Sequence, residues 1–205
     1  MLPDEELQTL SDAWNKAEEY LKIAEQISSE ALQPGINELR YAGRKVIEAL
    51  ALTERDQSRI RDLLRDARMD CQRAQHDAID ASISIISENV NVLLDRVGIT
   101  NTQAALPDVG KMIALIATTQ ERIAASRQDR NNRVDIYDSI KEVELPELKK
   151  LYDQLRACEP QLLREAEVAQ AKERQHVAFN WVNLAFAASG LVVGIISVLV
   201  ALVAF

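Results

Sequence analysis

An uncharged segment at the C-terminal end of the chain constrains the fold more than any other feature. The 29 residues from Val177 to Phe205 include no charged side chain. Their most apolar part, from Leu184 onward, would form roughly 33 Å of helix, which is enough to cross the hydrocarbon core of a bilayer. We therefore expect a single transmembrane helix at residues 179–205 that anchors the protein by its tail.

Small and polar residues recur along this segment in alternating steps of three and four. On a helix such spacing places them on one face, where small side chains let neighbouring helices approach closely. The pattern predicts a seam for self-association or the wall of a pore, with the Asn residues at its mouth. An inert anchor, with the Asn residues at the interface beside Trp181, is the alternative. The residues of the seam are Asn180, Asn183, Ala187, Gly190, Gly194, Ser197, Ala201 and Ala204.

The flanking residues indicate the orientation of the expected membrane helix. Lys172, Arg174 and, further back, Arg164 precede it, so the positive-inside rule predicts that the N-terminal 176 residues are cytoplasmic. The acidic start of the chain has no apolar region typical of a signal peptide. Cys71 and Cys158 then lie in a reducing compartment and belong to no C-x-x-C pair, so we expect small core residues and no disulfide.

Composition predicts an all-α fold for the cytoplasmic part. Five Pro and six Gly are too few for a sandwich or barrel, and no segment has the alternation of a strand. The formal net charge of −8 argues against direct nucleic-acid binding and favours protein partners. We expect a bundle of long helices with a single C-terminal transmembrane helix.

Apolar periodicity and Pro or Gly punctuation place the helices. We expect helices at about residues 3–30, 34–52, 53–98 and 109–145, a short helix ending before Glu159-Pro160, and a last helix from Pro160 into the membrane. Leu145-Pro146 is expected to interrupt the fourth helix. The expected domains are a cytoplasmic helical domain at 1–160, a connecting helix at 161–178 and the membrane tail at 179–205.

Catalytic and metal-binding residues are sparse. His76 and His176 are the only histidines, which provides neither a two-His zinc site nor a hydrolytic triad without distant partners. Asp80 lies one turn after His76 and could orient its imidazole, although a histidine at a helix surface or core edge is the simpler interpretation. We expect no enzyme activity, no cofactor and no metal.

Two groups of charged residues are candidates for binding surfaces. The stretch from Glu54 to Asp77 balances six Arg against six acidic residues, which is typical of a solvated helix face. A second group could meet RNA or a phosphate, but it lacks the interleaved aromatic residues and glycine-rich loop that such sites use. Its basic members are Arg122, Arg127, Arg130 and Arg133.

The segments from Ile36 to Arg44 and from Arg130 to Tyr137 resemble the HEPN superfamily of all-helical prokaryotic domains. The resemblance covers roughly residues 34–160. HEPN ribonucleases have an Arg, often followed by Asn, and then a His; Arg130 and Asn131 match this motif, but Asp135 occupies the place of the His. The resemblance therefore implies a degenerate motif without the family's RNA cleavage. It also implies a relation to membrane accessory effectors of prokaryotic antiviral systems, including type VI CRISPR systems.

Together these features predict a tail-anchored effector of the bacterial inner membrane. Its cytoplasmic helices would respond to a trigger or protein partner and form homo-oligomers, and the clustered tails would permeabilise or depolarise the bilayer in antiviral defence. A tail-anchored helical scaffold or tether without pore activity is the alternative. A membrane-bound ribonuclease of HEPN type, using Arg130 and Asp135, is a further alternative.

Overall fold

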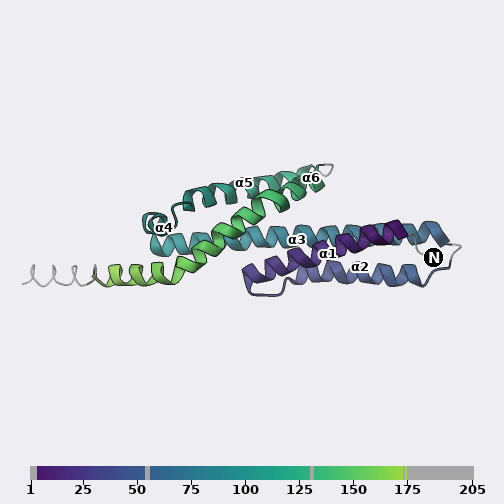
Figure 1. Ribbon diagram of the computed structural model, residues 1–205, viewed down its shortest axis with the longest axis horizontal. Coiled ribbons are helices and arrows are strands. Elements are labelled where there is room, and N and C mark those ends of the chain that lie inside the picture. The colour runs from purple at the N-terminus through teal and green to yellow at the C-terminus, as the bar shows by residue number, and fades with distance from the viewer. Residues whose placement is uncertain (1–3, 54–55, 130–131, 173, 175–205) are drawn as a thin grey trace, which may run out of the picture. The chain divides into compact units, whose positions relative to one another are not determined.

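The computed structural model describes residues 4–53, 56–129, 132–172 and 174, and these form an all-α structure without strands (Figure 1). The helices are α1 (Asp4–Ser28), α2 (Gln33–Leu50), α3 (Gln57–Val97), α4 (Ile99–Ala105), α5 (Val109–Gln128) and α6 (Arg133–Ser139). A π-helical turn, η2 (Ile140–Glu144), follows α6, and residues 145–172 are helical. The chain divides into two units after Ala157, and the tertiary contacts below belong to the first.

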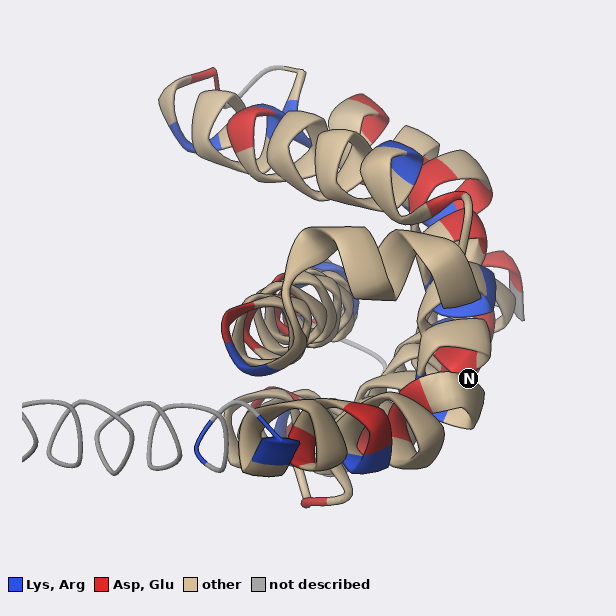
Figure 2. Ribbon diagram, turned by 90° about the vertical axis from the view of Figure 1, so that its left-hand side faces the viewer, with Lys and Arg blue, Asp and Glu red and all other residues tan. Residues whose placement is uncertain are grey.

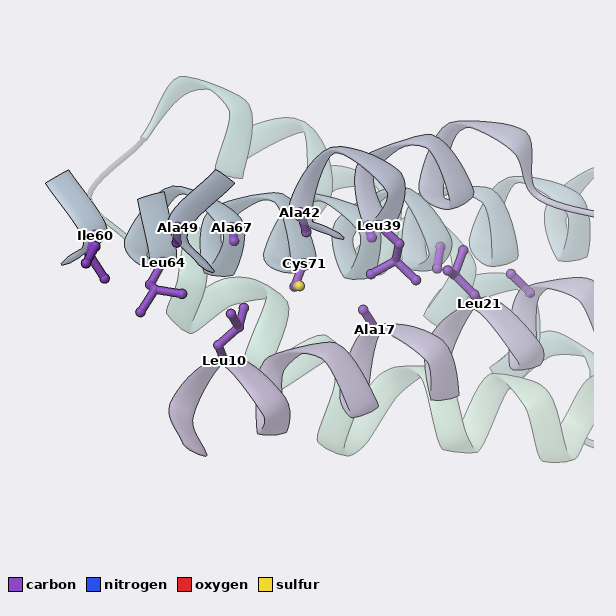
Figure 3. Packing of buried hydrophobic residues seen from close by; sticks show 13 residues of the cluster. Leu10, Ala17, Leu21, Leu39, Ala42, Ala49, Ile60, Leu64, Ala67 and Cys71 are labelled. Atoms are coloured by element: carbon purple, nitrogen blue, oxygen red, sulfur yellow. The ribbon is translucent and has the colours of Figure 1, made fainter. Parts of the chain in front are cut away.

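α1 and α2 both pack along the N-terminal half of α3 (Figure 1). α1 buries one apolar stripe at helical spacing, formed by Leu10, Ala17, Leu21, Ala24 and Ile27. On α3 the buried positions recur in steps of four and three, so they form one face opposite the two shorter helices (Figure 3). These positions are Ile60, Leu64, Ala67, Cys71, Ala74 and Ala78.

Small side chains occupy the centre of this core. Ala17, Ala42, Ala67 and Ala74 are fully buried, so little side-chain volume separates the three helix backbones (Figure 3). Gly35, near the start of α2, continues this close approach. A Cβ atom there would lie 2.4 Å from Leu21 Cδ2 and 3.4 Å from the Ala74 carbonyl oxygen.

The buried face of α3 changes beyond Ala78. Ile79, Ile83, Ile86 and Val90 are buried in the second half, whereas Val92 is half exposed. The reason is a change of neighbours, because this half packs against α4 and α5 instead of α1 and α2 (Figure 1). Gly98 ends α3 as predicted, with a φ of 84° that glycine adopts without steric cost.

Several predicted helix boundaries are wrong. The segment after Gly98 forms the short helix α4 instead of a loop, and the expected long fourth helix is divided between α5 and α6. Pro146 does not interrupt the helix, because the preceding turn widens to π geometry. The Leu145 N–H bonds to the Ile140 carbonyl oxygen, five residues back, which accommodates the proline next to it. Residues on both sides of Pro160 are helical as well.

The expected fold class requires a correction. Within the part of the chain that the structure describes, no helix is both long enough and apolar enough to cross a membrane. These helices bury only one face and carry charged residues on the other, so their charges break any apolar run of the required length. The observed class is an all-α bundle. Residues 179–205, where the sequence indicated a transmembrane helix, lie outside the described residues.

Candidate functional site

A group of polar side chains lies where the middle of α3 meets the end of α5 and α6. Tyr137 of α6 is fully buried, and its hydroxyl donates a hydrogen bond to Asp80 Oδ1 at 2.7 Å. Arg127 of α5 donates from Nη2 to Asp80 Oδ2 at 3.1 Å. Both carboxylate oxygens of Asp80 are therefore engaged, and three helices are tied at one residue. We call His76, Asp80, Arg127 and Tyr137 the clasp.

His76 contributes to the clasp through its ring. It stacks on Tyr137 with the ring centroids 3.9 Å apart and the planes 21° from parallel. The sequence suggested that Asp80 orients His76. Its carboxylate instead accepts hydrogen bonds from Tyr137 and Arg127. His76 is therefore a partly buried histidine at the edge of the core, the simpler of the two interpretations made from the sequence.

The surroundings of the clasp shift the pKa values of His76 and Tyr137, and these shifts determine the protonation of both side chains near neutral pH. Burial, followed by the positive charges of Arg133 and Lys141, lowers the pKa of His76 from 6.5 to about 4. Burial and the hydrogen bond to Asp80 raise the pKa of Tyr137 to about 12. His76 is therefore neutral and Tyr137 protonated at pH 7. Such a pair packs and donates a hydrogen bond but offers no activated nucleophile.

The basic group seen in the sequence is largely neutralised within the fold. Arg122 forms an ion pair with the buried Glu144, and Arg127 is held by Asp80. The guanidinium of Arg133 lies 5.6 Å from the centre of the Tyr137 ring, within cation–π range. Acidic and basic residues are also interspersed along the helices in the view of Figure 2. Arg122, Arg127 and Arg133 therefore make contacts within the fold.

The other predicted site residues lie mostly outside the part of the chain that the structure describes. Asp135 of the degenerate motif is exposed on α6, whereas Arg130 and Asn131 lie outside the described residues. The entire seam from Asn180 to Ala204 also lies outside them. Among the residues that the structure describes, no group of three His, Cys, Asp or Glu side chains is arranged to hold a metal ion.

A buried ionic cluster between α2 and α3 was missed in the sequence. Asp70 is 1% exposed and accepts hydrogen bonds from Lys45 Nζ at 2.6 Å and Arg73 Nη1 at 2.7 Å. The stretch from Glu54 to Asp77 is therefore not uniformly solvated, although its Asp62–Arg65 pair is exposed as expected. The signal that could have found Asp70 is its place directly before Cys71 in the buried stripe.

Comparisons with protein-family models, curated proteins and solved structures find no match. The resemblance to HEPN domains therefore stays a prediction from the residues that suggested it.

Proposed function

We propose that this protein is a membrane-associated effector of the bacterial inner membrane that assembles into homo-oligomers and permeabilises the bilayer in antiviral defence. The observation that carries the proposal is the contrast between the uncharged sequence 177–205 and the acidic, helical remainder of the chain. A sequence of that length without a charge is strongly favoured in lipid over water. The helical domain would then face the cytoplasm and receive the trigger.

The described helices support a role in protein association. α2 exposes Tyr41, Ile47 and Leu50, each more than half accessible. Large apolar side chains on one exposed helix are typical of surfaces that bind proteins. The His76–Tyr137 pair of the clasp, in contrast, offers no activated nucleophile, so the supporting features concern assembly.

Dye release from liposomes tests the proposal directly. Purified full-length protein, reconstituted at increasing protein-to-lipid ratio, is expected to release a trapped dye with a steep dependence on protein density. Double replacement of Gly190 and Gly194 by Leu is expected to abolish release, because bulky side chains block close approach along the proposed seam. The matched control replaces Leu191 and Val193 by Ile and should leak as the natural protein does. Intact vesicles at high protein load would refute permeabilisation.

A second candidate is a membrane-associated scaffold or tether, favoured by the exposed apolar residues of α2. Replacing residues 179–205 with an unrelated apolar anchor separates the two functions. A scaffold should retain its cellular effect in this chimera, whereas an effector that acts through its own apolar segment should lose it.

A further inference from the structure

One pocket of the described structure lies between the first turns of α1 and the first turns of α3, away from the clasp. Its volume is about 620 Å³, which is within the range of small-molecule sites. Leu64 is the one apolar residue that lines it, and the other lining side chains are charged or hydroxyl-bearing. A ligand of this pocket is therefore held mainly by polar contacts.

The α3 wall of the pocket is basic. Arg61, Arg65 and Arg68 follow one another at intervals of four and three residues, so they lie on one helix face and span about 10 Å along its axis. Arg65 is already paired with Asp62 at 3.1 Å. Arg68 makes no ion pair with any residue that the structure describes, and Arg61 uses only its Nε, toward the Gln57 carbonyl oxygen at 3.4 Å.

The α1 wall of the pocket is acidic, formed by Glu5 and Glu6. Within the described structure, Glu6 Oε2 is buried and has no hydrogen-bond donor. A carboxylate that lacks a hydrogen-bond donor favours a positive charge nearby, so a protonated amine beside Glu6 would be stabilised. Within the described structure, Glu5 and Glu6 form no ion pair with the arginines of the α3 wall. The negative charge of one wall and the positive charge of the other therefore remain available to a ligand between them.

We propose that this pocket binds a small zwitterion with a phosphate group and a protonated amine. The phosphate lies against Arg61 and Arg68, whose planar guanidinium groups bind phosphate through paired N–H donors. The amine lies against the acidic wall, where the negative charges of Glu5 and Glu6 attract it. A phosphorylated amino alcohol has this chemistry, either free in solution or as the headgroup of a lipid. The site stands independently of membrane permeabilisation, because it belongs to the described helical domain.

Calorimetric titration of the full-length protein in mild detergent tests the site. O-phosphoethanolamine is expected to bind at least tenfold more tightly than inorganic phosphate or ethanolamine alone, because only the joined molecule meets both walls. Arg68→Gln and Glu6→Gln should each weaken binding at least tenfold. Arg59→Gln, which removes an exposed charge from α3 outside the pocket, is the control and should leave binding unchanged.

Either of two results would overturn the inference: equal binding of phosphate and phosphoethanolamine, or binding that both pocket variants leave intact while circular dichroism shows a native fold. A short-chain, water-soluble phosphatidylethanolamine then identifies the source of the ligand. Binding as tight as that of O-phosphoethanolamine assigns a lipid headgroup, and binding at least tenfold weaker assigns the free molecule.

Discussion

Acid should destabilise this fold through His76, and the effect can be separated from all other titrations. The folded-state pKa of His76 is about 4, against 6.5 for an ordinary histidine, because the ring is buried against Tyr137 and faces Arg133 of α6 and Lys141 of η2. Asp138 is the acidic group whose charge opposes this shift. A lowered pKa means that the unfolded chain binds the proton first as the pH falls.

The sign and magnitude follow from linkage. The stabilising contribution of neutral His76 is complete above pH 6.5 and is lost as the pH falls toward 4. One pKa unit corresponds to about 1.4 kcal/mol, so the shift would cost about 2.5 kcal/mol at pH 4.5 before screening by solvent. Because the side chain is only partly buried, we expect a loss of about 2 kcal/mol between pH 7.5 and pH 4.5.

His76→Phe isolates this contribution. Phenylalanine keeps an aromatic ring against Tyr137 but has no proton to bind, so the variant should lose about 2 kcal/mol less stability than the natural protein over the same pH interval. Urea unfolding of both full-length proteins in mild detergent, followed by circular dichroism, measures the difference. Equal pH dependence in the two proteins would refute the reasoning, because every other titrating group is common to both.

Two core substitutions test the packing between α2, α3 and α1. Lys45→Met should destabilise the protein by about 2 kcal/mol, because it leaves the buried carboxylate of Asp70 with one cation instead of two. The control Arg44→Met, on the exposed side of α2, should change stability by less than about 0.5 kcal/mol. Equal effects in urea unfolding would contradict the burial of this ion pair. Ala74→Leu should cost about 3 kcal/mol or prevent folding, because the fully buried Ala74 faces neighbouring helices with no space for a larger side chain; an unchanged melting temperature would argue against close packing there.

Much of the fold could be predicted from local spacing. The stripe of α1, the first half of the α3 stripe and the end of α3 at Gly98 all follow from side-chain periodicity and glycine geometry. These features depend on residues three or four positions apart, which the sequence displays directly. The boundary between α5 and α6 was not visible, because the apolar pattern continues across it.

The clasp could not be predicted, because its members come from different helices. The hydrogen bond between Tyr137 and Asp80 joins residues 57 positions apart, and no sequence spacing indicates which helices meet. The His76–Asp80 pairing was the natural local hypothesis, but competing partners from α5 and α6 occupy the carboxylate. The sequence showed the arginines that form the basic wall of the pocket between α1 and α3, but it did not show that Glu6 faces them.

The sequence by itself determined the helical class and which face of each early helix is apolar, because backbone hydrogen bonding and side-chain spacing within a helix are local. Only the tertiary structure decided that α3 changes its buried face after Ala78, that Asp70 is buried and that Pro146 is accommodated by a π turn. Each of these depends on which neighbouring helix covers a given position, and that choice is made by the packing of the whole domain.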